Sequence, residues 1–301
     1  MRLAITGATG FVGSTTLDAA LAAGHSAKAL TRRDQPLRDG IEWVRGTLSD
    51  AEALAQLCDG TDAVIHIAGL TNTPDPAEFE AVNTGGTQAI MDAATAVNAR
   101  RFVFVSSLSA REPQLSDYGT SKSKAEALVE ASSLDWTIVR PPAVYGPRET
   151  EMFELFRSAK WGLVPLPPGG ATSVIHAGDL ASLLIALAEH SGLKTIYEPD
   201  DNREGGWAHK ELAQAIGRAV GKRSVLAPSL PKGLLNLGAG LDRLVRGDRA
   251  KLTNDRVSYM SHPNWVVRSD RRPPSQLWQP QIDVETGLKA TADWYKSEGW
   301  L

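Results

Sequence analysis

The stretch Leu3-Ala4-Ile5-Thr6-Gly7-Ala8-Thr9-Gly10-Phe11-Val12-Gly13 decides the fold class of this chain. An apolar run leads into three glycines with GxxGxxG spacing, and a helical pattern begins at Phe11. Gly7 permits a tight turn out of a strand, Gly10 lets a pyrophosphate approach backbone N–H groups, and Gly13 lets the helix pack closely on the strand. The pattern therefore predicts a nucleotide-cofactor site, although the spacing alone also fits a turn without a ligand. The same predicted site includes Thr9, Phe11 and Val12.

Short apolar runs alternate with helical patterns through the first half of the chain. We expect strands at Leu3–Thr6, Ala27–Thr31, Ile41–Val44, Ala63–Ile67, Phe102–Val105 and Trp136–Arg140. We expect helices at Phe11–Ala23, Ala51–Leu57, Ala77–Val97 and Ser121–Ala131. Nearly unbroken apolar strands that alternate with helices predict an α/β fold with a doubly wound (Rossmann) parallel sheet, covered on both faces. Its ligand should lie beyond the carboxyl ends of the strands.

Prolines and glycines break the regular pattern after Pro141. We expect a dinucleotide-binding domain over residues 1–145, with a returning segment near 174–190 that includes a helix at Asp179–Glu189. Residues 146–301 should form mainly a smaller α/β substrate-binding lobe. The helical patterns in that lobe cover Trp207–Val220 and Ile282–Gly299.

Composition argues against several classes of partner. The 301 residues carry a formal net charge of −3 and 6% aromatic residues, which gives no support for binding to nucleic acid or an anionic membrane. Cys58 is the single cysteine, so no internal disulfide can form, and no apolar run reaches membrane-spanning length. The chain enters a strand at once, which leaves no room for a signal peptide, and we expect a cytoplasmic protein. The six histidines lack metal-ligand spacing, so we expect no metal site.

Tyr118 and Lys122 lie four residues apart, on one face of a predicted helix. An ammonium near a phenol favours the phenolate and should lower the pKa of Tyr118, which suits a general acid/base for a carbonyl–alcohol pair. Ser106 and Ser107 follow the strand Phe102–Val105, where a hydroxyl could hydrogen-bond the same substrate oxygen. The alternative interpretation is an ordinary exposed tyrosine–lysine pair.

Several motifs in this order resemble those of extended short-chain dehydrogenases/reductases, the NAD-dependent epimerase/dehydratase family. The motifs are TGATGFVG at 6–13, HIAG at 66–69, VNTGGT at 82–87, FVFVSS at 102–107, YGTSK at 118–122 and RPPAVYGP at 140–147. The resemblance covers nearly the whole chain and implies a catalytic Tyr118, with Lys122 lowering its pKa and holding the nicotinamide ribose. It implies that Ser107 polarises the substrate, although Ser106 and Ser109 remain alternatives.

The resemblance also assigns supporting residues. Asn83 matches an asparagine that supports the lysine through water, although it also fits a polar residue inside a helix. Backbone groups that would frame the nicotinamide lie around Ala68, Gly69, Pro141 and Val144. Family members commonly form a homodimer through the helices that here start near Ala77 and Ser121.

The end of the second strand bears on the choice of cofactor. NAD binding favours an acidic side chain there, whereas the 2′-phosphate of NADP favours a cation. Here Arg32 and Arg33 follow Thr31, and no carboxylate appears before Asp34, so we favour NADP over NAD, with solvated surface arginines as the alternative. Leu48 can contact adenine, although relatives commonly carry a carboxylate just before it.

The substrate is less defined. Ala143 stands where sugar-nucleotide epimerases commonly carry Asn, and Tyr118 follows Ser107 by only 11 positions. The leading hypothesis is an NAD(P)-dependent oxidoreductase, with NADP preferred, that moves a hydride to or from the carbonyl or alcohol group of a small-molecule substrate. The alternatives are an NDP-sugar epimerase or dehydratase, and a catalytically idle NADP-binding sensor or assembly factor. We expect the eight tryptophans to be packing residues of the smaller lobe, with Trp161 as the alternative candidate for a pocket wall.

Overall fold

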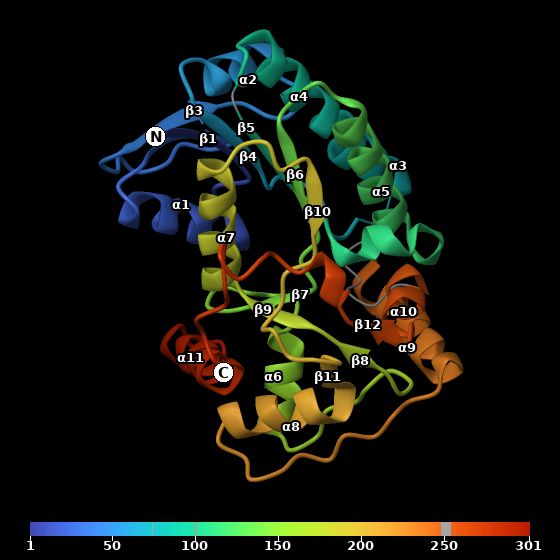
Figure 1. Ribbon diagram of the computed structural model, residues 1–301. Helices are drawn as coiled ribbons and strands as arrows, with labels where there is room; N and C mark the ends of the chain where they lie inside the picture. Colours follow the sequence, from blue (N-terminus) through green and yellow to red (C-terminus); the bar gives the residue numbers. More distant parts are fainter. Residues whose placement is uncertain (74, 100, 248–253) are drawn as a thin grey trace. The chain divides into compact units, whose positions relative to one another are not determined.

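The computed structural model describes residues 1–73, 75–99, 101–247 and 254–301 (Figure 1). The chain divides into two compact units. The first unit comprises Met1–Arg140, Leu180–Glu198 and Pro273–Gln279. The second unit comprises Pro141–Asp179, Pro199–Arg272 and Pro280–Leu301. The first break therefore falls after Arg140 rather than after residue 145, and the first unit takes in a third stretch that the sequence patterns did not suggest.

A seven-stranded sheet forms the centre of the first unit, in the order β10-β6-β5-β4-β1-β2-β3. Its strands are β1 (Arg2–Thr6), β2 (Ser26–Thr31), β3 (Ile41–Arg45), β4 (Ala63–His66), β5 (Arg101–Val105), β6 (Trp136–Val139) and β10 (Thr195–Tyr197). Every neighbouring pair is parallel. The order reverses between β1 and β4, so a doubly wound fold places its ligand crevice at the carboxyl ends of these two strands.

Helices cover both faces of this sheet. They are α1 (Phe11–Ala22), α2 (Ala51–Cys58), α3 (Pro76–Phe79), α4 (Gly86–Ala96), α5 (Asp117–Ala131) and most of α7 (Ala177–Glu189). Figure 1 shows α1 and α7 on one face and α2, α4 and α5 on the other. On the second face, apolar side chains of the helices pack against the strands, among them Leu54, Ile90, Val129 and Phe104. This burial stabilises the doubly wound arrangement that the alternating pattern predicted.

Two predicted helices differ from the structure. The expected helix Ala77–Val97 is interrupted by a π-helix at Glu80–Gly85, which includes Asn83. The expected helix Ser121–Ala131 begins four residues earlier, because the Ser116 hydroxyl caps it by accepting a hydrogen bond of 2.9 Å from the Gly119 N–H. The earlier start places Tyr118 in the first turn of α5. Short 3-10 helices at Leu108–Arg111 and Pro113–Leu115 precede that turn.

The second unit is built from short strands and helices. Its strands are β7 (Ala143–Tyr145), β8 (Ala171–Thr172), β9 (Val174–His176), β11 (Trp207–Ala208) and β12 (Asn264–Trp265). Its helices are α6 (Phe153–Lys160), α8 (His209–Ala219), α9 (Lys232–Arg246), α10 (Asn254–Met260), α11 (Val284–Ser297) and a 3-10 turn at Ser269–Arg271. Strand β7 pairs with β9, and β8 lies between β11 and β12. Phe156, Ile216, Leu288 and Tyr295 form the centre of its apolar core.

Candidate active site

The glycine-rich turn has the geometry that the sequence predicted. Gly7 has a φ of +72°, and a Cβ at this position would lie 2.7 Å from the Ala68 nitrogen. The Gly10 N–H donates to the Gly7 carbonyl at 2.9 Å, and α1 starts after Gly10 without a side-chain cap. A helix N-terminus of this kind presents N–H groups and a positive dipole end to an anion. The turn therefore fits a cofactor diphosphate. Thr9 and Gly10 are exposed there, and Phe11 and Val12 are partly exposed.

A chain of hydrogen bonds ties this turn to the helix that carries Asn83. The Thr87 hydroxyl donates to the Asn83 carbonyl at 2.6 Å, so it must accept from His66 Nε2 at 3.0 Å. His66 Nδ1 is then the acceptor of the Thr6 hydroxyl at 2.7 Å, and Thr6 accepts the N–H groups of Ile67 and Ala68. Burial, and then the Lys122 ammonium, lowers the pKa of His66 to about 3, which keeps the ring neutral in this tautomer.

Tyr118 and Ser107 are hydrogen-bonded side chain to side chain. The Ser107 oxygen accepts from the Ser109 N–H at 3.2 Å and from the Ser109 hydroxyl at 2.9 Å, which leaves its own proton for Tyr118. Burial raises the pKa of Tyr118, and the bond from Ser107 opposes this rise. The net direction is opposite to the lowered pKa expected from a nearby ammonium, because burial of the phenol dominates.

Lys122 is buried, with 4% of its surface exposed. Its ammonium donates to the Val105 carbonyl at 2.8 Å and lies 4.5 Å from the centre of the Phe104 ring. Burial lowers its pKa to about 8, and the Glu126 carboxylate opposes that shift. The backbone at the end of β5 thus holds Lys122 beside the carboxyl edge of the sheet.

Asn83 forms hydrogen bonds with the Leu70 backbone and the Ser121 hydroxyl. Its Oδ1 accepts the Leu70 N–H at 2.7 Å, and its Nδ2 donates to the Leu70 carbonyl at 3.0 Å and to the Ser121 hydroxyl at 2.9 Å. A Cβ on Gly69 would lie 3.0 Å from Asn83 Oδ1 and 3.8 Å from Lys122 Nζ, so Gly69 lies close to both side chains. Asn83 therefore fastens the loop after β4 to α5.

The three candidate serines differ in their surroundings. Ser107 contacts Tyr118, and Ser109 is fully buried behind it. The Ser106 hydroxyl is buried and has no hydrogen-bond partner in the part of the chain that the structure describes. Of the three, Ser107 is thus the one with the geometry of a substrate-polarising group, and Ser106 is an unsatisfied polar group at the same strand end.

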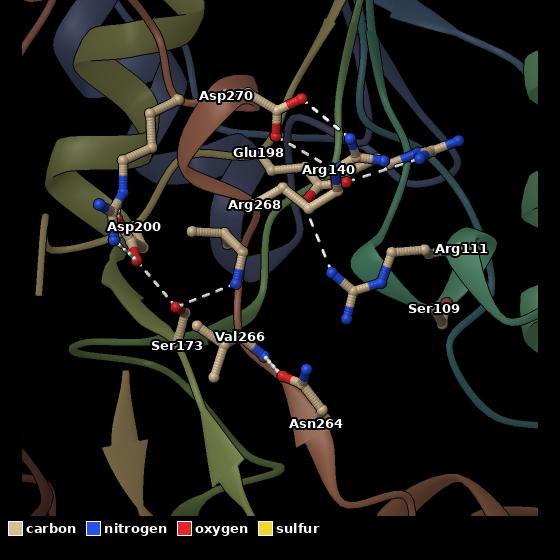
Figure 2. A network of polar contacts seen from close by, with 12 residues as sticks. Ser109, Arg111, Arg140, Ser173, Glu198, Asp200, Asn264, Val266, Arg268 and Asp270 are labelled. Carbon is tan, nitrogen blue, oxygen red and sulfur yellow. Dashed lines mark hydrogen bonds and ion pairs between the residues drawn. The ribbon is translucent and has the colours of Figure 1, made fainter. Parts of the chain in front are cut away.

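Arg111, Arg140 and Glu198 belong to a largely buried ionic cluster of the first unit (Figure 2). Arg140, at the end of β6, forms two hydrogen bonds with Glu126 of α5, at 2.6 and 2.9 Å. Glu198 lies 3.6 Å from both Arg140 and Arg111, and 1% of its side chain is exposed. Buried charged side chains in proteins are usually paired with an opposite charge. Here the ion pairs connect α5 to the segment after Ser109. Sequence motifs gave no sign of this cluster, because its members come from four separate segments.

The predicted adenosine end of the site lies at the ends of β2 and β3. Arg32 and Arg33 are exposed, and neither forms an ion pair with any described residue. The Thr31 hydroxyl donates to the Arg33 carbonyl at 2.7 Å and shapes this turn. Leu48 packs against the apolar core and against Gly86 of α4, where an added Cβ would meet it at 2.6 Å. Two further predicted cofactor residues, Pro141 and Val144, belong to the second unit.

Comparison with known proteins identifies the family. The NAD(P)H-binding family model matches residues 7–191. Ceramide reductase from Caulobacter vibrioides is 35% identical, over 99% of this chain and 96% of the relative. The chain belongs to the extended short-chain dehydrogenases/reductases. It is thus an NAD(P)-dependent enzyme of the epimerase/dehydratase family, as its motifs predicted.

Other relatives show the breadth of this family. UDP-glucose 4-epimerase from Vibrio cholerae is 29% identical over 71% of this chain and 75% of the relative. The crystal structure of the Bordetella bronchiseptica enzyme WbmH in complex with NAD+ has a TM-score of 0.74, at 20% identity and 99% coverage of both chains. This likeness confirms the Rossmann-like fold. Among the described residues, no helix is both long and apolar enough to cross a bilayer.

Proposed function

We propose that the enzyme uses NADP(H) to interconvert a carbonyl and an alcohol on a lipid of the ceramide type. The contact between Ser107 and Tyr118 beside the buried Lys122 carries the chemical part of this proposal. The 35% sequence identity to ceramide reductase, over almost the full length of both chains, supports the substrate class. The bound nicotinamide would supply or accept the hydride.

Each side chain has a distinct task in the proposed reduction. Because burial raises its pKa, Tyr118 is protonated at neutral pH and can donate its proton to the developing alkoxide. When a substrate is bound, Ser107 would turn its one proton from Tyr118 to the same substrate oxygen, since Ser109 occupies its acceptor sites. Lys122 would hold the nicotinamide ribose and add positive charge near the phenol.

The proton-transfer role is tested with Tyr118→Phe and a matched control. We expect turnover of a carbonyl lipid to fall by about 10²–10⁴-fold in Tyr118→Phe while NADPH binding stays unchanged. Tyr197→Phe, on β10 of the same unit, should keep wild-type activity. Full activity of Tyr118→Phe would refute the proposed chemistry, and tight NADPH binding without turnover of any substrate by the wild-type enzyme would favour the sensor alternative.

The NADP preference rests on Arg32 and Arg33, which are exposed and unpaired among the described residues. A guanidinium suits a 2′-phosphate by charge and geometry. We expect Arg32→Ala to weaken NADPH binding by roughly tenfold or more and to leave NADH binding unchanged. Arg2→Ala is the control, because Arg2 lies at the opposite end of β1 and pairs with Glu42. Tighter binding of NADH than NADPH by the wild-type enzyme would exclude this preference.

A sugar-nucleotide epimerase is the second candidate. The Vibrio cholerae relative supports it, whereas Ala143 in place of the expected asparagine counts against it. Screening UDP-sugars for epimerisation beside carbonyl lipids separates the two candidates. We also propose that the enzyme is a cytoplasmic homodimer built through the region of α4 and α5. Sedimentation of the purified protein measures its oligomeric state.

A further inference from the structure

Three large apolar side chains are exposed near the ends of α6 and α8, in the second unit. The exposed fractions are 83% for Trp161, 42% for Leu163 and 70% for Leu226. Leu163 and Leu226 face each other in an isolated parallel bridge, in which the Val164 N–H donates to the Leu226 carbonyl at 2.8 Å. We call these three residues the Trp161 patch. Trp161 is thus well exposed, whereas packing residues were expected among the tryptophans, with Trp161 as the candidate for a pocket wall.

Exposed cations flank the same segments. Lys160 directly precedes Trp161, and Lys222 and Arg223 precede Leu226 by a few residues. None of the three forms an ion pair with any residue in the described ranges, whereas nearby Arg157 and Arg218 pair with Glu154 and Glu285. The net charge of the whole chain is negative, so this local group of unpaired positive charges stands out.

A hollow lies beside the patch. It has a volume of about 260 Å³ and is lined by Lys160, Val220, Lys296 and Leu301. That volume is several times the ~30 Å³ that a water molecule occupies in the liquid, so a phosphate group can enter. Lys296 also pairs with Asp293 at 3.5 Å, and Lys160 has no such partner among the described residues. The lining of the hollow therefore combines two apolar residues with two lysines.

We propose that the Trp161 patch docks the enzyme on the surface of an anionic phospholipid bilayer. Tryptophan favours the headgroup level of a membrane, where its ring is partly apolar and its N–H stays hydrated. Leu163 and Leu226 would enter the acyl boundary, and the cations would contact lipid phosphates. This reverses the expectation from net charge, because binding at a surface depends on local charge within about a Debye length. The docking does not depend on the substrate, and it would bring the enzyme to the lipid substrate proposed above.

Sedimentation of the full chain with vesicles tests this proposal. We expect binding to vesicles of equimolar phosphatidylcholine and phosphatidylglycerol, weak binding to phosphatidylcholine alone, and release by salt. Neutralising the three cations together, by Lys160→Gln, Lys222→Gln and Arg223→Gln, should weaken binding about a hundredfold. Trp161→Ser should weaken it roughly tenfold. Since all four side chains are exposed, the melting temperature should stay unchanged.

Two controls match these variants. Leu37→Ser removes another exposed apolar side chain, which is 99% exposed and lies in the first unit. A second triple variant, Lys194→Gln, Lys210→Gln and Arg271→Gln, removes the same number of exposed cations elsewhere. Both should bind vesicles as the wild type does. Equal loss in the controls, or no binding by the wild type, would overturn the proposal. A Trp161→Ser protein that changes oligomeric state without changing vesicle binding would assign the patch to a second copy of the chain instead.

Discussion

The turn between β1 and α1 allows a sharp test, because two of its glycines serve different purposes. A Cβ on Gly13 would lie 2.0 Å from the Gly7 carbonyl oxygen and 2.6 Å from the Gly7 carbonyl carbon. Both atoms are backbone, so the helix or the strand must move. A Cβ on Gly10 meets only the Gly7 oxygen, at 3.3 Å, and the φ of −83° at Gly10 is open to alanine.

These distances set different magnitudes for the two alanine variants. Gly13→Ala should lower the free energy of unfolding by about 3 kcal/mol, since overpacking a tight interior costs about 1–3 kcal/mol and rigid backbone puts this site at the upper end. Gly10→Ala should cost about 1 kcal/mol or less, the usual effect of alanine at a helix N-cap. It should still weaken NADPH binding by roughly tenfold, because its methyl group blocks the approach of the pyrophosphate.

Urea unfolding and NADPH fluorescence titration of both variants measure these effects separately. In our interpretation, Gly13→Ala loses stability, and Gly10→Ala loses affinity with little loss of stability. Equal loss of stability in the two variants would refute the geometric argument. Wild-type NADPH affinity in Gly10→Ala would refute the assignment of this helix N-terminus as the diphosphate site.

Three further predictions concern buried polar groups. Between about pH 6.5 and 3, His66 is protonated in the unfolded chain but neutral in the folded chain. The free energy of unfolding should therefore fall by up to about 5 kcal/mol on acidification through this range. Urea unfolding across pH should show a smaller fall in His66→Gln. Between about pH 8 and 10.5, Lys122 is protonated in the unfolded chain but mostly neutral in the folded chain. The free energy of unfolding should therefore rise with pH across that range by about 3 kcal/mol relative to Lys122→Met. Parallel pH profiles of the two proteins would contradict this. Thr87→Val leaves the buried His66 N–H without its acceptor and should cost about 1–3 kcal/mol in thermal unfolding. Thr15→Val, which loses only a hydroxyl bond to the Phe11 carbonyl of its own helix, should cost less than half as much.

Most of the first unit could be predicted from sequence. The six predicted strands agree with β1 to β6 within a residue at each end, because buried parallel strands are continuous apolar runs. Strand β10 was missed, since Thr195–Tyr197 has only three residues, too few to show a strand pattern. In the second unit, the expected helices Trp207–Val220 and Ile282–Gly299 agree with α8 and α11 within two residues at each end. Its strands were not predicted, because they have two or three residues and carry no periodicity.

Sequence by itself determined the cofactor turn, the order of strands and helices, and the spacing of Tyr118 and Lys122, because each of these depends on residues close together in the chain. Tertiary structure decided which serine meets Tyr118, why the pKa of Tyr118 rises, and how Asn83 binds the loop after β4. It also decided that Trp161 is exposed beside unpaired cations. These outcomes depend on burial and on contacts between distant segments, and both arise only when the chain folds.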